Sequence, residues 1–322
     1  MKYYLGVDGG GSKTLAVIAD ERGREVARAY AGNGNHQIDR FGAERNLVQA
    51  VEGALARGGL RKEDLAAAVY GLAGADREPD FKILRPMVRT LGIPRHDVVC
   101  DTHIALRAGT NLSFGIVCIC GTGTNALGVN PGGRTLQCGG YTYAYGDFGG
   151  GGALAVEAFR SAIRAWEGRG PQTLLTQKLL ERLGYPDMET LYHACLDRDY
   201  RPTADLAPLV FEVADRDAVA RSILARQGAE LGVTAAALVR KLGMEQLAFD
   251  VVLAGSVLQR GDGDGKYVRP YIARKLKAAA PDARLRLLDT EPVLGALLLA
   301  IELDRADVPA ATRDALALAL TV

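Results

Sequence analysis

The sequence lacks features that would suit it to nucleic acid or to a membrane. Its 322 residues include 39 Lys and Arg against 38 Asp and Glu, so charge of neither sign dominates. A nucleic-acid-binding domain usually carries a clustered basic excess, and this chain shows none. The longest apolar stretches, such as 292–303, are much shorter than the roughly 20 residues of a membrane-spanning helix. We therefore expect neither a nucleic-acid partner nor a membrane partner.

Cysteine and histidine are scarce, which limits disulfide and metal chemistry. The five cysteines are odd in number and lie mostly in strand-like runs, a pattern typical of reduced, buried thiols. Cys118 and Cys120 alternate along one such run, but no second pair completes a set of metal ligands. No basic segment followed by an apolar one opens the chain, so we expect no secretory signal and a cytoplasmic location.

An internal repeat organises the residues that are present. The glycine-rich segment 9–17 recurs in altered form as 121–129, at a constant offset. Each copy reads as strand, tight turn, strand, tight turn, strand, which is the pattern of a β-meander. Helical patterns alternating with apolar strands follow each copy. The repeat predicts two α/β domains of related build, divided near residue 113.

The two glycine-rich turns are candidate phosphate-binding loops. Exposed backbone N–H groups in such turns form concave anion sites, and missing side chains let phosphate oxygens approach. Neither turn is a P-loop, because Ser12 stands where that motif requires lysine. Neither opens a helix as the glycine motif of a dinucleotide-binding fold does. The turns therefore predict a grip on a polyphosphate.

Two aspartates lie at the ends of short apolar strands. Asp8 ends the first strand and Asp101 follows 98–100, and ligands of α/β sheets collect at the carboxyl ends of strands. A carboxylate there could take the proton of a hydroxyl that attacks a phosphoryl group. From the residues alone, Asp8 could instead form an Asx turn, and Asp101 could cap the helical segment 102–107.

Five motifs follow one another along the chain: DGGGSKT at 8–14, GTGTN at 121–125, Cys-Gly-Gly with Gly-Asp at 138–147, VLAGSV at 252–257 and EPVLGA at 291–296. Together they resemble the N-acetylglucosamine kinase branch of the sugar-kinase and actin superfamily, which belongs with the benzoyl-CoA reductase activase type of ATPase. The resemblance implies an α/β fold of two ribonuclease-H-like, actin-like ATPase domains with a central ATP and substrate cleft. It assigns 1–113 plus 297–322 to the N-terminal domain and 114–296 to the C-terminal domain.

The resemblance also implies ATP and Mg²⁺ as cofactors. Asp8 would hold Mg²⁺ through water, since magnesium keeps several waters and takes few carboxylates. The phosphates would lie against the two glycine turns and the adenosine against the fourth motif. The implied nucleotide-binding residues are Gly10, Gly11, Ser12, Lys13, Thr122, Gly123, Gly255 and Ser256.

Asp101 would be the catalytic base and would also contact the acceptor. The other implied acceptor-binding residues are Asn35, His36, Thr124, Asn125, Gly140, Tyr141 and Asp147. One departure from the family pattern falls here: 146–150 reads Gly-Asp-Phe-Gly-Gly, where the family has Gly-Asp-Glu-Gly-Ser. An acidic residue and a hydroxyl are therefore missing, which bears on the sugar more than on ATP.

The sequence thus favours an ATP-dependent kinase that transfers the γ-phosphoryl group to a hydroxyl of an amino sugar. The expected acceptor is N-acetylglucosamine or a relative such as glucosamine or N-acetylmuramic acid, and the expected assembly is a homodimer. The alternative is an ATPase that activates a partner reductase or dehydratase through a shared iron–sulfur cluster. Activases hold that cluster in a Lys-Cys-Ala-Ala-Gly-Thr-Gly-like context, whereas Cys138 precedes Gly-Gly-Tyr. A regulator that has lost catalysis is disfavoured, because Asp8 and Asp101 are both present.

Overall fold

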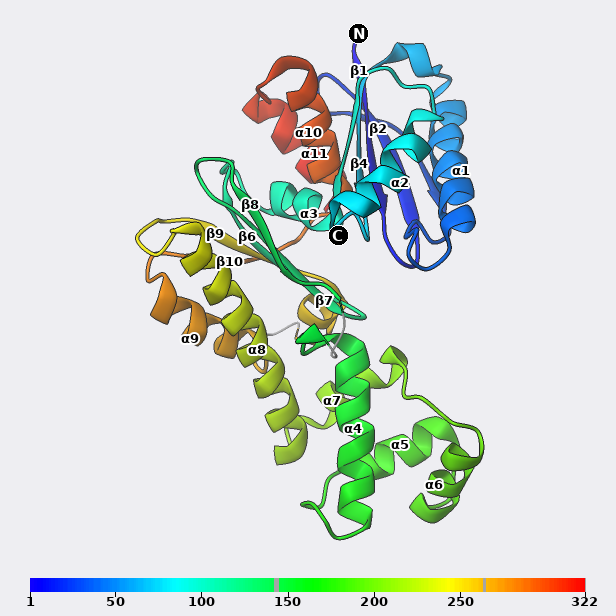
Figure 1. Cartoon of the computed structure of the whole chain (residues 1–322), viewed down its shortest axis with the longest axis vertical. Coiled ribbons are helices and arrows are strands. Elements are labelled where there is room, and N and C mark those ends of the chain that lie inside the picture. The colour runs from blue at the N-terminus through cyan, green and yellow to red at the C-terminus, as the bar shows by residue number, and fades with distance from the viewer. Residues whose placement is uncertain (142–144, 263–264, 322) are drawn as a thin grey trace. The chain divides into compact units, whose positions relative to one another are not determined.

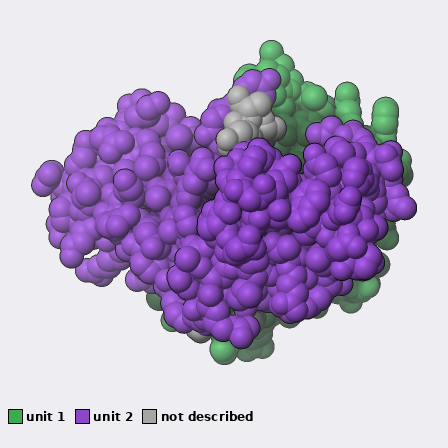
Figure 2. Space-filling view, turned by 90° about the horizontal axis from the view of Figure 1, so that it is seen from below, with its two compact units in different colours: residues 1–117, 288–322 green, residues 118–287 purple. Residues whose placement is uncertain are grey.

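The computed structural model describes residues 1–141, 145–262 and 265–321 (Figure 1). The chain divides into two compact units (Figure 2). Unit 1 comprises residues 1–117 and 288–322, and unit 2 comprises residues 118–287. The domain bounds expected from the sequence, at 113 and 297, differ from these and stay a prediction. Each unit contains one five-stranded sheet.

Unit 1 begins with a three-stranded meander and continues with helices that alternate with parallel strands. Its sheet has the order β3-β2-β1-β4-β5, in which β1, β2 and β3 are antiparallel neighbours and β1, β4 and β5 are parallel. Its elements are β1 (Tyr3–Gly9), β2 (Thr14–Asp20), β3 (Glu25–Ala31), α1 (Arg40–Gly58), a 3₁₀ turn (Lys62–Asp64), β4 (Leu65–Leu72), α2 (Glu78–Arg89), β5 (His96–Cys100), α3 (Asp101–Gly109), α10 (Val293–Arg305) and α11 (Ala310–Ala319).

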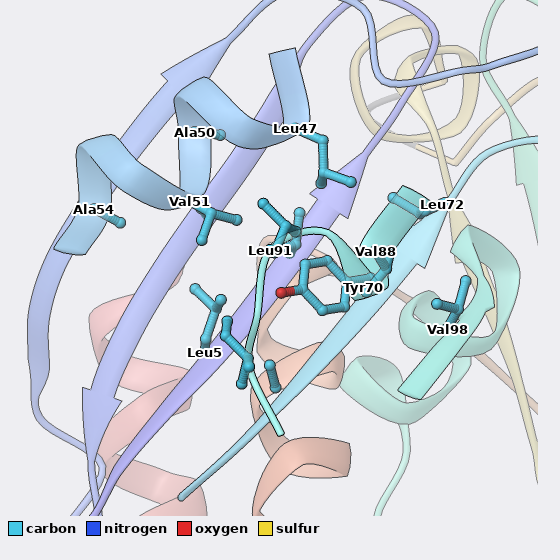
Figure 3. Packing of buried hydrophobic residues seen from close by; sticks show 14 of the residues in the cluster. Leu5, Leu47, Ala50, Val51, Ala54, Tyr70, Leu72, Val88, Leu91 and Val98 are labelled. Carbon is cyan, nitrogen blue, oxygen red and sulfur yellow. The ribbon is translucent and has the colours of Figure 1, made fainter. Parts of the chain in front are cut away.

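The sheet of unit 1 is covered on both faces, and the alternation of side chains along β1 explains how. Leu5 and Val7 point to the same side of the sheet and belong to a buried hydrophobic cluster that also contains Tyr70 of β4. Residues of α1 and α2 pack against this cluster, in which Leu5 and Tyr70 are labelled in Figure 3. Gly6 faces the other way and lies under α10, where a β-carbon would come within 2.8 Å of the Leu297 side chain. Close packing of α10 on β1 therefore requires a glycine at this position.

Unit 2 repeats the sheet and adds a larger set of helices. Its sheet has the order β10-β9-β6-β7-β8. Its elements are β6 (Gly115–Cys120), which begins just before the unit boundary, β7 (Thr124–Val129), β8 (Thr135–Gly139), α4 (Gly150–Trp166), α5 (Leu175–Leu183), α6 (Met188–Asp197), a 3₁₀ turn (Ala204–Leu206), α7 (Ala207–Val213), α8 (Ala218–Leu242), β9 (Asp250–Ala254), the π-helical segment η4 (Val257–Gly261), α9 (Arg269–Ala279) and β10 (Arg284–Leu287).

The two sheets have the same connectivity, which confirms the repeat predicted from the sequence. In each, the first strand is central, the meander strands lie on one side and two later strands lie on the other.

Helix α8 is the longest helix, and residues at both its ends explain where it starts and stops. The Asp217 carboxylate accepts the N–H groups of Val219 and Ala220, and Gly243 ends the helix in the left-handed region at φ 67°. Within the described ranges, no helix is both long and apolar enough to span a bilayer.

Candidate active site

Three aspartates follow the three parallel strands of unit 1. Asp8 lies near the end of β1 beside Gly71 of β4, Asp101 follows β5 directly, and Asp76 lies in the loop after β4. Because β1, β4 and β5 run parallel, their carboxyl ends meet at one edge of the sheet. Asp8 and Asp101 were predicted here from the sequence, whereas Asp76 was missed.

The Cys100 thiol ties two of these carboxylates together. It donates to Asp101 Oδ1 at 3.2 Å and also lies 3.5 Å from Asp76 Oδ1. Burial and the two nearby carboxylates raise the pKa of Cys100, so the thiol stays protonated and acts as a donor. Asp101 is the first residue of α3, and the preceding N-cap position is Cys100. Asp101 therefore does not occupy the N-cap position that the capping alternative gave it.

Burial and mutual proximity disfavour the charged forms of Asp8 and Asp101 at this edge. Burial and then the Asp101 carboxylate raise the pKa of Asp8 to about 7, while Lys13 opposes the shift. Burial is also the main cause that raises the pKa of Asp101; Asp76 adds to this shift, and hydrogen bonds from Cys100 and from the Thr102 backbone oppose it. Carboxylates in this state gain stability from an added cation.

The fit of Mg²⁺ to this edge depends on additional ligands. Within the described ranges, no three His, Cys, Asp or Glu side chains cluster closely enough to hold a metal alone. Magnesium commonly takes one or two carboxylates and completes its shell with waters and substrate phosphates. The oxygen donor of Asp8 fits that mode of binding, in which nucleotide and metal enter together.

The glycines of the first turn are not required by the fold. A β-carbon on Gly10 or Gly11 would meet its nearest neighbours at 3.5 and 3.4 Å, which is ordinary contact, and neither residue has a left-handed φ. By contrast, a β-carbon on Gly9 would come within 2.7 Å of the Leu72 side chain. Packing therefore does not explain the bare backbone at 10–11, and phosphate binding by this turn stays a prediction. Ser12 and Lys13 complete this turn and are exposed.

The second turn shows the same property more clearly. A β-carbon on Gly121 or Gly123 would meet nothing within 4 Å. The N-terminus of α4 supports the turn from behind: Gly151 N–H donates to Gly121 O at 2.7 Å, and Gly152 N–H donates to Thr122 O at 2.9 Å. These helix N–H groups are already used, so a phosphate at this turn would face the exposed Thr122 and Gly123 backbone.

Gly255 differs from these glycines, because the fold itself requires it. It has a φ of +97°, and a β-carbon there would lie 2.4 Å from the Cys120 carbonyl oxygen. Close approach of the β9 end to the β6 end therefore excludes any side chain. Ser256 is exposed beside it, immediately before η4. Contact of either residue with adenosine stays a prediction.

The predicted acceptor residues of unit 1 differ in accessibility. Asn35 is half-buried; its Oδ1 accepts the Gln37 N–H at 2.8 Å, which fixes the side chain and leaves its amide hydrogens directed elsewhere. The neighbouring His36 is buried, with Nε2 3.4 Å from Asp80 Oδ1. Asn35 thus offers a polar group to a ligand, whereas His36 is held inside the unit by Asp80.

Unit 2 contains a cavity of about 250 Å³ that brings most of its predicted acceptor residues together. Thr124, Asn125, Tyr141 and Asp147 all line it. Asp147 Oδ2 accepts the Tyr141 N–H at 2.7 Å, which shapes the loop at the rim. Gly140 lies beside the cavity at φ 95°, where a β-carbon would come within 2.6 Å of Asn125 Oδ1. The lining also includes Glu230, Leu231 and Thr234 of α8, which the sequence reading missed.

Two sheets of identical order, each with a glycine-rich turn after its central strand, define the actin-like ATPase fold. Comparison with known families agrees. The profile of the BadF/BadG/BcrA/BcrD ATPase family matches residues 5–300, and the chain belongs to this family.

Two relatives that match this chain over nearly its full length are named as sugar kinases. The chain is 29% identical to an N-acetyl-D-glucosamine kinase of Dictyostelium discoideum, over 92% of this chain and 97% of the relative. It is also 29% identical to an N-acetylmuramic acid/N-acetylglucosamine kinase of Clostridium acetobutylicum, over 93% and 98%. A crystal structure described as an N-acetylglucosamine kinase of Chromobacterium violaceum has a TM-score of 0.73 at 25% identity, covering 93% and 99%.

Proposed function

We propose that this protein is an ATP- and Mg²⁺-dependent kinase that phosphorylates a hydroxyl of an amino sugar, N-acetylglucosamine or a close relative. The observation that carries the proposal is the position of Asp101, which directly follows the parallel strand β5 at the edge where Asp8 also lies. Burial raises the pKa of the Asp101 carboxyl group there. Full-length similarity to two sugar kinases supports the choice of acceptor.

In this proposal Asp101 is the general base. Its carboxylate takes the proton of the acceptor hydroxyl as that oxygen bonds to the γ-phosphorus and ADP leaves. A base works best when its pKa lies near the working pH, so a raised pKa suits Asp101 to this role. The Cys100 hydrogen bond to Asp101 Oδ1 and the Thr102 backbone hydrogen bond hold the carboxylate in place.

The remaining roles are those of binding. Asp8 would hold Mg²⁺, which when bound neutralises charge on the phosphate oxygens. The turns at 10–13 and 122–123 would hold the phosphates, and 255–256 would lie against adenosine. Asn35 and the unit 2 cavity residues would hold the sugar.

The cysteines weigh against the alternative of an activase. Iron–sulfur clusters are bound by thiolates, and burial raises the pKa of Cys118 and of Cys120 to about 12. Cys138 is only partly buried, but it lines the cavity of unit 2 beside the predicted acceptor residues. A colourless purified protein with no visible absorbance agrees with the kinase, and a brown protein with a cluster absorbance contradicts it.

The direct test is a screen with ATP, Mg²⁺ and a panel of glucosamine, N-acetylglucosamine, N-acetylmuramic acid and glucose. We expect ADP to form in equal amount with a sugar monophosphate, identified by ³¹P NMR and mass spectrometry. Without sugar, ADP formation should be slow. ADP release at one rate whether or not a sugar is present would contradict the kinase.

A further inference from the structure

Helix α8 places an acidic side chain and a hydroxyl in the lining of the unit 2 cavity, and the neighbouring loop at 146–150 carries neither at positions 148 and 150. The loop carries Phe148 and Gly150 where the family pattern has an acidic residue and a hydroxyl. Glu230 and Thr234 of α8 line the cavity and supply one of each. They are four residues apart, so they lie on one face of the helix. An acid and a hydroxyl thus reach the same cavity from a distant element.

Phe148 and Gly150 contact α8 directly. Phe148 lines the cavity, and the Arg226 guanidinium lies 4.0 Å from the centroid of its ring. Gly150 N–H donates to Gln227 Oε1 at 2.9 Å. Arg226 and Gln227 are one turn of α8 before Glu230. Both contacts therefore hold the loop against the turn of α8 that precedes Glu230.

The cavity lining carries acidic residues and no basic ones. Asp147 and Glu230 line it, and Lys, Arg and His are absent from its described lining. Asp147 already accepts a backbone N–H, whereas among the described residues no side chain pairs with the Glu230 carboxylate, and Thr234 Oγ1 donates to the Glu230 backbone carbonyl instead. Glu230 is half-buried at the cavity, and a ligand cation bound there would gain a favourable charge pair with its carboxylate.

The lining also contains an uncharged hydrogen-bond acceptor, the side-chain oxygen of Asn125. Asn125 lines the cavity, and its Oδ1 is buried and accepts no hydrogen bond from the described residues. Together with Glu230 and the Thr124 and Thr234 hydroxyls, the lining is rich in acceptors. A protonated amine is a donor of three hydrogen bonds and accepts none, so it matches this lining. An acylated nitrogen instead brings a carbonyl acceptor, and a sugar acid brings a negative charge.

We propose that the cavity selects an amino sugar with a free, protonated amine, and that Glu230 determines this specificity. The inference rests on the proposed kinase function and names its acceptor class more narrowly. Glucosamine should therefore be a better acceptor than N-acetylglucosamine, and the anionic N-acetylmuramic acid should be the poorest of the three.

The test compares kcat and KM for these three sugars in the wild type, in Glu230→Gln and in Glu189→Gln. Glu189 is an exposed glutamate of α6 outside the cavity lining and serves as the matched control. In Glu230→Gln we expect KM for glucosamine to rise about 10- to 100-fold, the range for a lost hydrogen bond to a charged group. KM for N-acetylglucosamine should change little, and Glu189→Gln should match the wild type.

The outcomes separate the two proposals. If no sugar is phosphorylated by the wild type, the kinase function itself is wrong. If sugars are phosphorylated but Glu230→Gln raises every KM equally, or leaves the ratio between glucosamine and N-acetylglucosamine unchanged, only the amine selectivity is wrong. Should Glu230→Gln fail to fold, Glu230→Asp and the wild-type order of the sugars decide, because Glu230→Asp retains the charge and should retain part of the preference.

Discussion

The two sheets share one strand order but carry different chemistry at the end of the central strand. Asp8 lies there in β1, and Cys120 lies at the matching position of β6. Burial is the first cause of both shifts, raising the pKa of Asp8 to about 7 and that of Cys120 to about 12. Near neutral pH the first can carry charge and bind a cation, whereas the second stays a neutral thiol.

This difference teaches that the repeat duplicates a scaffold rather than a site. Unit 1 has a cluster of carboxylates where its parallel strands end. Both units have a glycine turn whose bare backbone is not required by packing, and unit 2 adds a cavity lined by amide, hydroxyl and acid groups. We infer that unit 1 performs the proton transfer and that unit 2 mainly binds. The following predictions test that division, from the largest expected effect to the smallest.

Replacing the proposed base should have the largest effect. Asp101→Asn keeps size and shape but cannot accept a proton, so turnover with the best sugar should fall about 10²- to 10⁴-fold. Asp97→Asn, on the exposed side of the same strand, is the matched control and should keep wild-type turnover. Steady-state ADP release coupled to sugar phosphorylation measures both. Near-normal turnover of Asp101→Asn would mean that another group is the base.

Asp8→Asn should weaken the use of magnesium. Losing one carboxylate ligand should raise the Mg²⁺ concentration for half-maximal turnover about 10-fold or more, the scale of one charged contact. Turnover measured against Mg²⁺ concentration at saturating ATP checks this. An unchanged magnesium curve removes Asp8 from the metal site.

The same variant should alter the pH dependence of stability in the absence of ligands. The folded pKa of Asp8 is raised to about 7 from 3.8, so its contribution to stability is present below about pH 4 and is lost as pH rises through 7. The melting temperature of the wild type minus that of Asp8→Asn should therefore decrease as the pH rises from about 4 to about 7. Saturating Mg–ATP should reduce that fall, since the bound cation favours the ionised carboxylate. A difference that stays constant with pH would contradict the raised pKa.

Glycine substitutions separate positions that the fold needs from positions that a ligand needs. Gly255→Ala must distort a backbone at φ +97° that approaches Cys120 closely, so we expect a loss of about 1–3 kcal/mol in the free energy of unfolding. Gly123→Ala enters open space and should leave stability unchanged. Chemical denaturation of both variants measures the contrast, and equal losses would contradict it.

The smallest effect concerns the Cys100 thiol. Its hydrogen bond lowers the pKa of Asp101 against the larger effect of burial, so Cys100→Ala should raise that pKa further. The acidic limb of the pH–rate profile should move to higher pH by a fraction of a unit, with the plateau unchanged. Cys100→Ser keeps a donor and should stay closer to the wild type. A shift to lower pH in Cys100→Ala would contradict this role of the thiol.

The sequence allowed prediction of features that depend on local pattern. The repeat predicted both meanders, and strand ends predicted where Asp8 and Asp101 would lie. Asp76 was missed because its loop separates it from β4, and only the parallel neighbours bring it to the Cys100 thiol. Glu230 was missed because it lies on a helix far along the chain from the loop that it complements. Such long-range contacts leave no periodic signal in the sequence.

One binding measurement, made on a variant of each unit, tests most directly whether unit 1 performs the proton transfer while unit 2 mainly binds. A non-hydrolysable ATP analogue with Mg²⁺ is titrated calorimetrically into wild type, Asp101→Asn and Gly123→Leu. The account predicts wild-type affinity in Asp101→Asn, despite its lost turnover. It predicts affinity about 10- to 100-fold weaker in Gly123→Leu, whose β-carbon meets nothing within 4 Å and whose longer side chain covers the exposed backbone of the turn. Unchanged affinity in Gly123→Leu, or affinity lost with turnover in Asp101→Asn, would contradict it.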